Sequence, residues 1–374
     1  MKIAIDPSKS ERILSQDGST DILDSRTFLL PNKLHKKITQ MYQKAYGIIE
    51  TLAPLHVGAS AGEETGNLNL IFRDQFTLTG IIPGSSIRGR FRADMRDSHP
   101  QKANDWYGRE VVEIKSNGEE TTDEPTAKKY TETSEALVKF EYASLVWLPV
   151  FCPGQPVVWV SCPRLLKRYQ AISGKLTDRS RKLPKPYTAS EGLPVREDEK
   201  TIDGEQQKVK VLFFNLGFLD LKYSQDLSPW IPPGVDLPED KLVIVGDNDI
   251  ATIHDMALYR QSRTKLQNDM KKVENFFGLE ALPEGCILAF SMGIKKKKPK
   301  PDDRNSKDGE TDKKETQQEL TSKEYFYDLK SMSFKILKNK SDEQSEEISK
   351  ELYFGGLESI GMGRCNVTLV GVGE

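Results

Sequence analysis

The segment Thr79–Arg96, TGIIPGSSIRGRFRADMR, has the pattern of a helix start whose first turns are basic. Three apolar residues recur at the spacing of a core-facing helical stripe: Ile87, Phe91 and Met95. Three arginines have the same spacing one residue later: Arg88, Arg92 and Arg96. Because the N-terminus of a helix is its positive end and favours acidic residues, these arginines require a negative partner.

The residues that precede the arginines predict a binding site for a phosphate group. Ser85 or Ser86 is expected to cap the helix, and Gly84 would let a ligand approach the backbone closely. Exposed amides, serine hydroxyls and guanidinium groups would together hold the phosphate. The alternative interpretation is a capped surface helix with solvated arginines. The candidate contacts of this segment are Gly84, Ser85, Ser86, Arg88, Arg90 and Arg92.

A second candidate loop, GGLESIGMG, covers residues 355–363. Its glycines allow left-handed turns or close packing of the backbone. The alternative interpretation is a tight connection between a helix at 345–354, SEEISKELYF, and a final strand. The candidate residues of this loop are Gly355, Gly356, Gly361, Gly363 and the adjacent Arg364.

The chain of 374 residues is long enough for one large domain or two smaller ones. No apolar run approaches the roughly 20 residues needed to span a bilayer. The first residues, MKIAIDPSKSERILSQDG, lack the apolar core of a secretory signal. A cytoplasmic location without membrane contact is therefore expected.

Charge and metal-ligand patterns exclude several classes of protein. With 54 basic and 56 acidic residues the formal net charge is -2, so a nucleic-acid site must come from local placement of charge. The four cysteines form no CxxC pair and the four histidines are scattered, which argues against a structural zinc site or a disulfide framework. The cysteines are expected to be free and buried.

Residues 1–45 are predicted to form an extension that contains a helix at 32–45, and residues 46–374 a single domain. Polar insertions are expected at about 98–135, 173–210 and 295–345. The last begins with the basic run Lys295–Lys298 and is too charged to fold by itself. Strands interleaved with two or three helices predict an α+β sheet with helices on one face, and ferredoxin-like topology is the simplest candidate.

The order of these motifs resembles the repeat-associated RNA-binding proteins of CRISPR systems, the RAMP superfamily. The matching motifs are PLHVGA (54–59), IIPGSSIRGRFR (81–92) and GGLESIGMGRCNV (355–367). Two longer stretches look like the backbone subunit of type III effector complexes, the III-B and III-D kinds: ASLVWLPVFCPGQPVVWVSCPRLLKRY (143–169) and YRQSRTKLQNDMKKVENFFGLEALPEGCILAF (259–290). The resemblance runs from about Tyr46 to Val370.

This resemblance implies a ferredoxin-like, RNA-recognition-type core with a protruding thumb hairpin. Several copies or paralogues would stack along one CRISPR guide RNA, beside other effector subunits, and the guide would pair with target RNA. The Pro-Gly-Ser-Ser helix and the glycine loop would hold the guide backbone, with Arg263 and Lys265 as further RNA contacts. Sequence choice would rest on base pairing. Binding would require no cofactor.

The resemblance also makes a prediction about cleavage. Active members of the family cut target RNA with an aspartate in the loop before the Pro-Gly-Ser-Ser segment. Aligning on Arg73–Asp74 places Leu68 at the catalytic position, between Asn67 and Asn69. None of these three side chains can ligate a divalent ion as a carboxylate does, or act as a proton acceptor. A non-cleaving backbone subunit is therefore expected, with Asp74 shaping a turn.

Two alternatives stay open. The chain could be a target-RNA endonuclease that uses Glu63, Glu64 or a shifted loop residue with a divalent metal such as Mg²⁺. His56 and Glu280, which match family residues near the cleavage site and in the thumb region, are further catalytic candidates. An enzyme of another class would bind a small phosphorylated metabolite through the same glycine loops. A guide-processing ribonuclease is not supported, because no histidine pair has a suggestive spacing.

Overall fold

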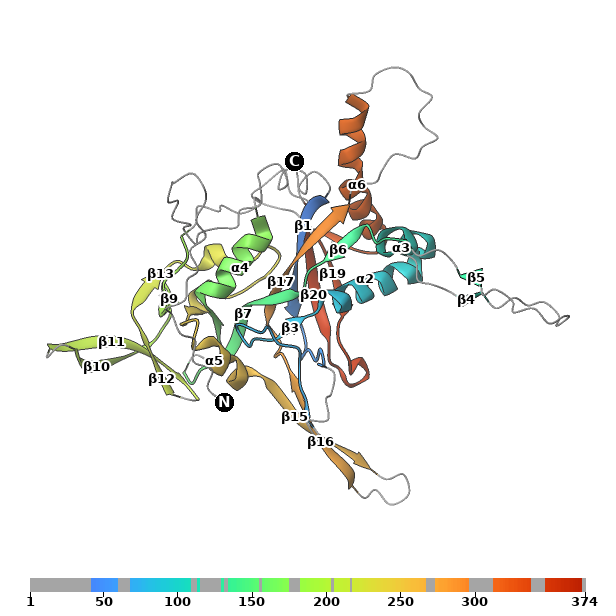
Figure 1. The fold of residues 1–374 in the computed structure, drawn as a ribbon. Coiled ribbons are helices and arrows are strands. Elements are labelled where there is room, and N and C mark those ends of the chain that lie inside the picture. The colour runs from blue at the N-terminus through green and yellow to red at the C-terminus, as the bar shows by residue number, and fades with distance from the viewer. Residues whose placement is uncertain are drawn as a thin grey trace, which may run out of the picture. The chain divides into compact units, whose positions relative to one another are not determined.

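A sheet of twelve strands organises the part of the chain that the computed structural model describes (Figure 1). The described residues are 42–59, 68–108, 113–114, 129–130, 134–154, 157–174, 182–202, 205–215, 217–266, 273–295, 312–337 and 347–371. The strands of this sheet are β1 (Tyr42–Thr51), β3 (Ile81–Ile82), β6 (Val138–Phe140), β7 (Ala143–Phe151), β8 (Val157–Ser161), β9 (Thr188–Ser190), β13 (Tyr223–Gln225), β14 (Leu242–Ile244), β17 (Ile287–Lys295), β18 (Lys335–Leu337), β19 (Glu347–Tyr353) and β20 (Arg364–Val370). Their order across the sheet is β13-β9-β14-β8-β7-β17-β1-β20-β19-β18, with β3 beside β7 and β6 beside β17.

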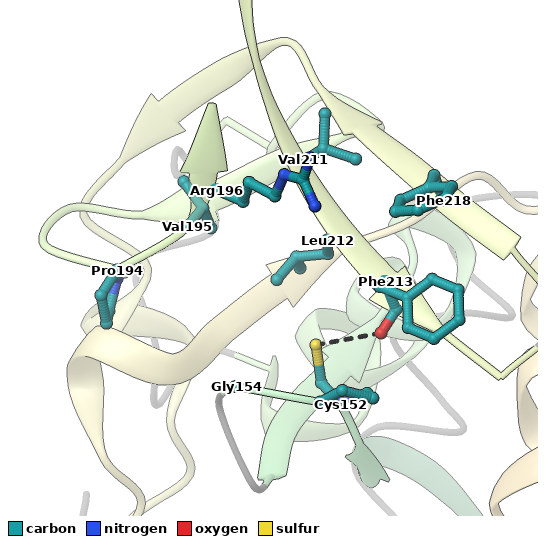
Figure 2. A pocket seen from close by; sticks show the side chains of 10 residues that line it. Cys152, Gly154, Pro194, Val195, Arg196, Val211, Leu212, Phe213 and Phe218 are labelled. Carbon is teal, nitrogen blue, oxygen red and sulfur yellow. Dashed lines mark hydrogen bonds between the residues drawn. The ribbon is translucent and has the colours of Figure 1, made fainter. Parts of the chain in front are cut away.

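Two three-stranded sheets extend away from the large sheet (Figure 1). The first, called the β10–β12 arm below, consists of β10 (Arg196–Ile202), β11 (Glu205–Phe214) and β12 (Gly217–Leu221). The second is the hairpin of β15 (Tyr259–Leu266) and β16 (Val273–Ala281), to which β2 (Leu68–Asn69) adds a parallel strand. A further short pair is β4 (Glu113–Ile114) with β5 (Lys129–Tyr130). The arm contacts the chain just after β7. There the Cys152 thiol donates a hydrogen bond of 3.3 Å to the Phe213 carbonyl of β11 (Figure 2).

Five helices accompany these strands in the described ranges. They are α2 (Gly84–Ser98), α3 (Pro100–Tyr107), α4 (Pro163–Ser173), α5 (Ile250–Ala257) and α6 (Asp312–Ser331). Short 3₁₀ turns lie at Ser228–Trp230, Glu239–Lys241 and Glu358–Ile360. No helix in the described ranges has the length and apolar character needed to cross a membrane.

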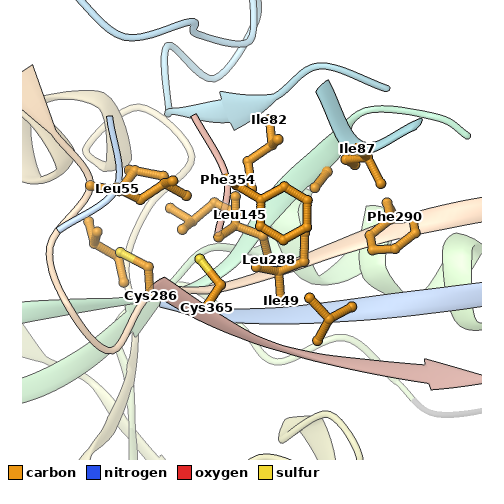
Figure 3. Packing of buried hydrophobic residues seen from close by; sticks show 14 of the residues in the cluster. Ile49, Leu55, Ile82, Ile87, Leu145, Cys286, Leu288, Phe290, Phe354 and Cys365 are labelled. Carbon is orange, nitrogen blue, oxygen red and sulfur yellow. The ribbon is translucent and has the colours of Figure 1, made fainter. Parts of the chain in front are cut away.

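Strand β1 lies in the middle of the large sheet, antiparallel to β17 on one side and to β20 on the other. Ile49 lies opposite Leu288 and Val367, and all three enter one buried cluster (Figure 3). The preceding residue, Ile48, points to the other face and enters a second cluster, as the two-residue period of a strand requires. Both faces of the central strands are therefore buried.

Helices cover both of these faces. The first cluster takes residues from α2, α3 and α6: Ile87, Phe91, Met95, Trp106, Tyr107, Tyr325, Phe326 and Leu329. The second takes residues from α4 and the segment 227–237: Leu166, Tyr169, Leu227, Trp230 and Leu237. The chain thus has a mixed α+β fold, as predicted, and the expectation of helices on one face is wrong. The core-facing stripe predicted for α2 is confirmed, because its three apolar residues are fully buried.

Two segments predicted as helices are strands. Residues 345–354 were expected to be helical, but Glu347–Tyr353 forms β19, which pairs with β18 and β20. Ladder hydrogen bonds on both sides outweigh the helix preference of its glutamates and lysine. Residues 42–45, expected to end a helix, begin β1; the rest of that predicted helix lies outside the described residues.

The polar stretches expected as insertions contain regular elements. Helix α3 follows α2 directly, β9 and β10 lie within 173–210, and α6 lies within 295–345. The α6 helix is fixed to α3 by a hydrogen bond of 2.9 Å between the buried hydroxyls of Tyr325 and Tyr107. Asp328 of α6 also accepts hydrogen bonds from Lys102 and Trp106. The basic run at 295–298 lies outside the described residues apart from Lys295, the last residue of β17. All four cysteines are buried thiols, as predicted.

Candidate nucleic-acid interface

Helix α2 begins at Gly84, and its N-cap residue is Pro83. Ser85 and Ser86 therefore lie within the first turn, and no side chain in the described residues caps the helix. The expectation that a serine caps α2 is wrong, because Pro83 already has the extended backbone of a cap and leaves the serines one position too late. Ser85 is exposed and Ser86 partly exposed, so their hydroxyls remain accessible.

Gly84 is required by packing inside the protein. A Cβ atom at this position would lie 2.4 Å from the carbonyl oxygen of Phe140, far inside van der Waals contact. The backbone that approaches Gly84 is therefore that of β6. This contact is a reason for glycine that needs no ligand, and the prediction that Gly84 lets a ligand approach the backbone stays a prediction.

The arginines of α2 have different surroundings. Arg88 donates a hydrogen bond to the carbonyl of Tyr107, which ties α2 to the end of α3. Arg90 lies 3.7 Å from one oxygen of Asp94, whose other oxygen accepts a shorter bond of 2.7 Å from Lys350. The buried Nε of Arg90 has no acceptor among the described residues. Arg92 is partly exposed, and the helix has no acidic residue in its first turn.

The glycine loop at 355–363 joins two adjacent strands of the sheet, β19 and β20. Gly355 has φ of +75°, and a Cβ there would lie 2.1 Å from the carbonyl oxygen of His56. That same oxygen accepts a hydrogen bond of 3.0 Å from the amide of Gly356. The loop thus packs on the chain segment around His56, which only glycine permits. At Gly356 and Gly361 the described residues leave open space.

The residue before the glycine loop and the start of α2 lie in one buried cluster. Phe354, which precedes the loop, is in this cluster with Ile82 and Ile87 (Figure 3). The chain therefore enters both predicted phosphate-binding segments from the same core. Arg364, directly after the loop, is half exposed and lies 3.5 Å from Glu351 on the neighbouring strand.

The other predicted RNA contacts lie on the projecting hairpin, away from the glycine loop in the sequence. Arg263 is partly exposed, and its guanidinium lies 5.6 Å from the ring centroid of Phe277 on the opposite strand. Lys265 is opposite Asn275 in the same ladder. Both residues belong to β15, in the hairpin that projects from the sheet (Figure 1).

Four charged side chains form an ion network at the base of this hairpin. Arg73 donates hydrogen bonds to Asp255 of α5 and, at 3.0 Å, to Glu280 of β16. Arg260 of β15 reaches the other oxygen of Glu280 at 3.3 Å. The Glu280 side chain is only 5% exposed, so both of its oxygens are held by arginines in a largely dry site.

Two residues that align near the family's cleavage site, His56 and Leu68, lie next to the β16 strand of this network. The Nδ1–H of His56 donates a hydrogen bond of 2.6 Å to the backbone carbonyl of Glu280. Leu68, at the expected catalytic position, lies in β2 opposite Gly278 of β16. The structure thus brings His56, Leu68 and Glu280 together. Glu63 and Glu64 lie outside the described residues.

Asp74 shapes a turn, as predicted. One of its oxygens accepts hydrogen bonds from the amides of Phe76 and Thr77, and the other accepts one from the Tyr142 hydroxyl. Burial would raise the pKa of the Asp74 carboxyl, but the hydrogen bonds from Thr77 and Phe76 outweigh it and lower this pKa. Asp74 therefore stays ionised while it holds the turn.

His254 is a buried residue that sequence reasoning missed. Its Nε2 accepts a hydrogen bond of 2.9 Å from the Gly80 amide, so the neutral ring carries its proton on Nδ1. Burial, followed by the charge of Arg73, lowers the pKa of His254 to about 4. Arg73, Asp255 and Arg260 were missed as well, because partners so far apart in the chain leave no spacing signal.

The described residues form a mixed α+β protein with an arginine-bearing helix, a packed glycine loop and a projecting hairpin whose base is an ion network. A family model described as the RAMP superfamily matches residues 48–366. The chain belongs to the RAMP superfamily. No match was found among the curated proteins.

Three solved structures illustrate what this chain is similar to. A chain from a cryo-EM structure of type III-B Cmr-beta in the apo state has a TM-score of 0.52 and 16% identity, covering 87% of this chain and 96% of that one. A chain of Cmr-beta bound to cognate target RNA has a TM-score of 0.50 and 16% identity, covering 88% and 98%. Oligomeric Cmr4 from Pyrococcus furiosus has a TM-score of 0.48 and 14% identity, covering 88% and 99%. At these identities the first two show a shared fold.

Proposed function

We propose that this chain is a guide-RNA-binding backbone subunit of a type III CRISPR complex, of the III-B or III-D kind, that does not itself cut RNA. The observation that carries the proposal is the arginine-bearing surface of α2 in a RAMP-superfamily chain, where the start of α2 shares a buried cluster with Phe354, the residue before the glycine loop. Its partners would be a CRISPR guide RNA, the target RNA paired to it, and further effector subunits.

The fold supports this assignment. The related structures are of type III-B Cmr-beta, one of them bound to cognate target RNA. A ferredoxin-like core belongs to the proposal, supported by the antiparallel order β17-β1-β20 and by α2, which follows β1 in the chain. The projecting β15–β16 hairpin fits the thumb. A cytoplasmic site of action follows from the same assignment.

The geometry of α2 is suited to binding the phosphate backbone of the guide RNA. Arg90 keeps a loose contact of 3.7 Å with Asp94, and its side chain is 29% exposed. The exposed part of its guanidinium could donate hydrogen bonds to a phosphate oxygen. Exposed Ser85 adds a hydroxyl, and the first helix amides add positive potential. Contacts of this kind fix register and carry no sequence information.

Two features support a subunit that does not cleave. The alignment on Arg73–Asp74 puts Leu68, which has no carboxylate, at the family's catalytic position. Glu280, the acidic side chain nearest to it in the ladder, is paired with Arg73 and Arg260. Mg²⁺ would be needed only by a nuclease, and binding would need no cofactor.

The test uses the complex as it purifies. We expect its absorbance ratio and extracted nucleic acid to reveal bound guide RNA. With matched target RNA and Mg²⁺, we expect no cut opposite this subunit. A cut that disappears on substitution of Glu63 and Glu64 would establish the endonuclease alternative instead. A protein without RNA and without affinity for guide RNA would overturn the proposal and favour the enzyme that binds a phosphorylated metabolite.

A further inference from the structure

The β10–β12 arm encloses one side of an apolar hollow of about 640 Å³. Figure 2 shows Pro194, Val195 and Arg196 at one end and the rings of Phe213 and Phe218 at the other. Leu212 and the turn after β7 line the space between them. A volume of this size can hold one or two large side chains or a small ligand.

Two aromatic rings at this hollow are exposed to solvent. Phe213 and Phe218 lie opposite each other in the β11–β12 ladder, with ring centroids 4.9 Å apart. They are 38% and 62% exposed. Neighbouring exposed rings at the rim of an apolar hollow are typical of a surface that another molecule covers.

The charges of the arm indicate that this molecule is not a nucleic acid. Residues 196–221 contain four basic and six acidic residues. Arg196 is bound to Asp198 at 2.7 Å, and Lys200 is bound to Asp220. A polyanion would meet an excess of negative charge, and two of the four basic residues already pair with acidic side chains. An apolar protein segment is the occupant that fits.

The same chain presents such a segment elsewhere. In the turn at 74–78, Phe76 is 78% exposed and Leu78 is 52% exposed. The turn is rigid, because one oxygen of Asp74 accepts hydrogen bonds from the amides of Phe76 and Thr77 and from the Thr77 hydroxyl. Leu78 has φ of +56°, a left-handed conformation that the Leu78 amide stabilises through a bond of 2.9 Å to the Asp74 carbonyl. A pre-formed apolar projection loses little conformational entropy when it binds.

We propose that the Phe76–Leu78 turn of one copy inserts into the hollow of the β10–β12 arm of the next copy. This inference rests on the proposed stacking of several copies along one guide RNA. The turn and the hollow are different surfaces of the chain, so the contact is head-to-tail and can repeat along a line. Each pair of neighbouring copies would then be held together by this apolar contact as well as by the RNA that both bind.

Cross-linking of two single-cysteine variants tests the contact. The four native cysteines are buried, so an introduced surface cysteine is the accessible thiol. Phe76→Cys protein and Phe218→Cys protein are mixed with guide RNA under mild oxidation. We expect a disulfide-linked dimer from this mixture, because the bond forms only between Cβ atoms about 4 Å apart. A chain that carries both substitutions should give a ladder of longer products.

The matched control pairs Phe218→Cys with Tyr327→Cys, which places an equally accessible thiol on α6, where Tyr327 is 70% exposed. This mixture should give no dimer above background. Equal dimer in both mixtures, or none in either while the RNA still holds several copies, would overturn the inference and leave the proposed function intact. Absence of RNA from the wild-type protein would instead contradict the proposed function.

A second measurement follows the number of copies on each RNA by mass photometry. Phe76→Ser and Phe218→Ser should each lower the affinity of one copy for the next about tenfold, since a buried aromatic anchor is lost. Tyr327→Ser should leave copy number unchanged. If Phe218→Ser weakens RNA binding by an isolated copy and leaves copy number unchanged, the hollow binds RNA and the inference is wrong.

Discussion

Arg73 and Glu280, 207 residues apart in the chain, are joined by a hydrogen bond of 3.0 Å at the base of the β15–β16 hairpin. Arg73 also binds Asp255, so one guanidinium connects the segment before α2 with α5 and with the hairpin. The orientation of the hairpin therefore depends on an ion network that is far from the hairpin tip. The same contact leaves the carboxylate of Glu280 buried and paired with a guanidinium.

Replacement of Glu280 by glutamine should destabilise the protein by about 2 kcal/mol, because a desolvated hydrogen bond between charged groups is lost. Arg260 contributes little to this figure, since its side chain is half exposed. The free energy of unfolding from urea denaturation measures the effect. Guide-RNA binding at low temperature should be retained, as expected for a residue that positions the hairpin.

Glu284→Gln is the matched control for that experiment. Glu284 is exposed and lies in the turn that follows β16. Its substitution should change the free energy of unfolding by less than about 0.5 kcal/mol. If the two variants are equally stable, the ion network does not hold the hairpin.

His254 should make the stability of the protein depend on pH below neutrality. Its pKa is about 4 in the folded protein, against an ordinary value of 6.5, so the unfolded chain binds a proton that the folded protein does not. The stability contributed by the neutral ring is therefore full above about pH 6.5 and is lost as the pH falls toward 4. Between pH 7 and pH 5 the loss should be about 2 kcal/mol.

His254→Gln separates this contribution from that of other titrating groups. The glutamine side chain can still accept a hydrogen bond from the Gly80 amide, and it does not titrate. Urea denaturation at pH 7 and pH 5 should show a smaller difference for the variant than for the wild type. Parallel pH dependence in the two proteins would exclude His254 as its source.

Two glycines of α2 should respond to alanine in opposite directions. A Cβ at Gly84 would lie 2.4 Å from the Phe140 carbonyl oxygen, whereas at Gly89 nothing in the described residues lies within 4 Å. Gly84→Ala should therefore destabilise the protein by about 1–3 kcal/mol through overpacking. Gly89→Ala should stabilise it by about 0.5–1 kcal/mol, since alanine is the better helix former. Thermal melting of both variants measures the contrast, and a shift of the same sign in both would contradict it.

Local periodicity predicted much of the fold. The apolar spacing in α2 depends on neighbours a few residues away, so the sequence reveals it. Strand β19 was missed because its conformation comes from ladders with β18 and β20, which the local sequence does not contain. The mixed α+β class could be predicted, while the placement of helices on two faces could not.

The sequence likewise predicted the local patterns of the candidate site but not its long-range contacts. The basic stripe of α2 is a local pattern and was found, but the partner of Gly84 is a backbone carbonyl of Phe140 that no motif indicates. The network of Arg73, Asp255 and Glu280 joins segments about 180 and 207 residues apart. Contacts of this kind become visible only when the chain is folded.

Removal of single arginines from α2 should weaken guide binding uniformly across RNA sequences. Arg90→Ala and Arg92→Ala should each lower affinity and reduce the slope of log K against log salt by about one, the share of one phosphate contact. Arg88 is unsuitable for this test because its guanidinium binds the Tyr107 carbonyl, so its loss would also loosen α3. Arg96→Ala, about one turn beyond Arg92 near the end of α2 and exposed, is the matched control and should leave the slope unchanged. If all three variants bind guide RNA with the wild-type slope, the phosphates do not lie on this face of α2.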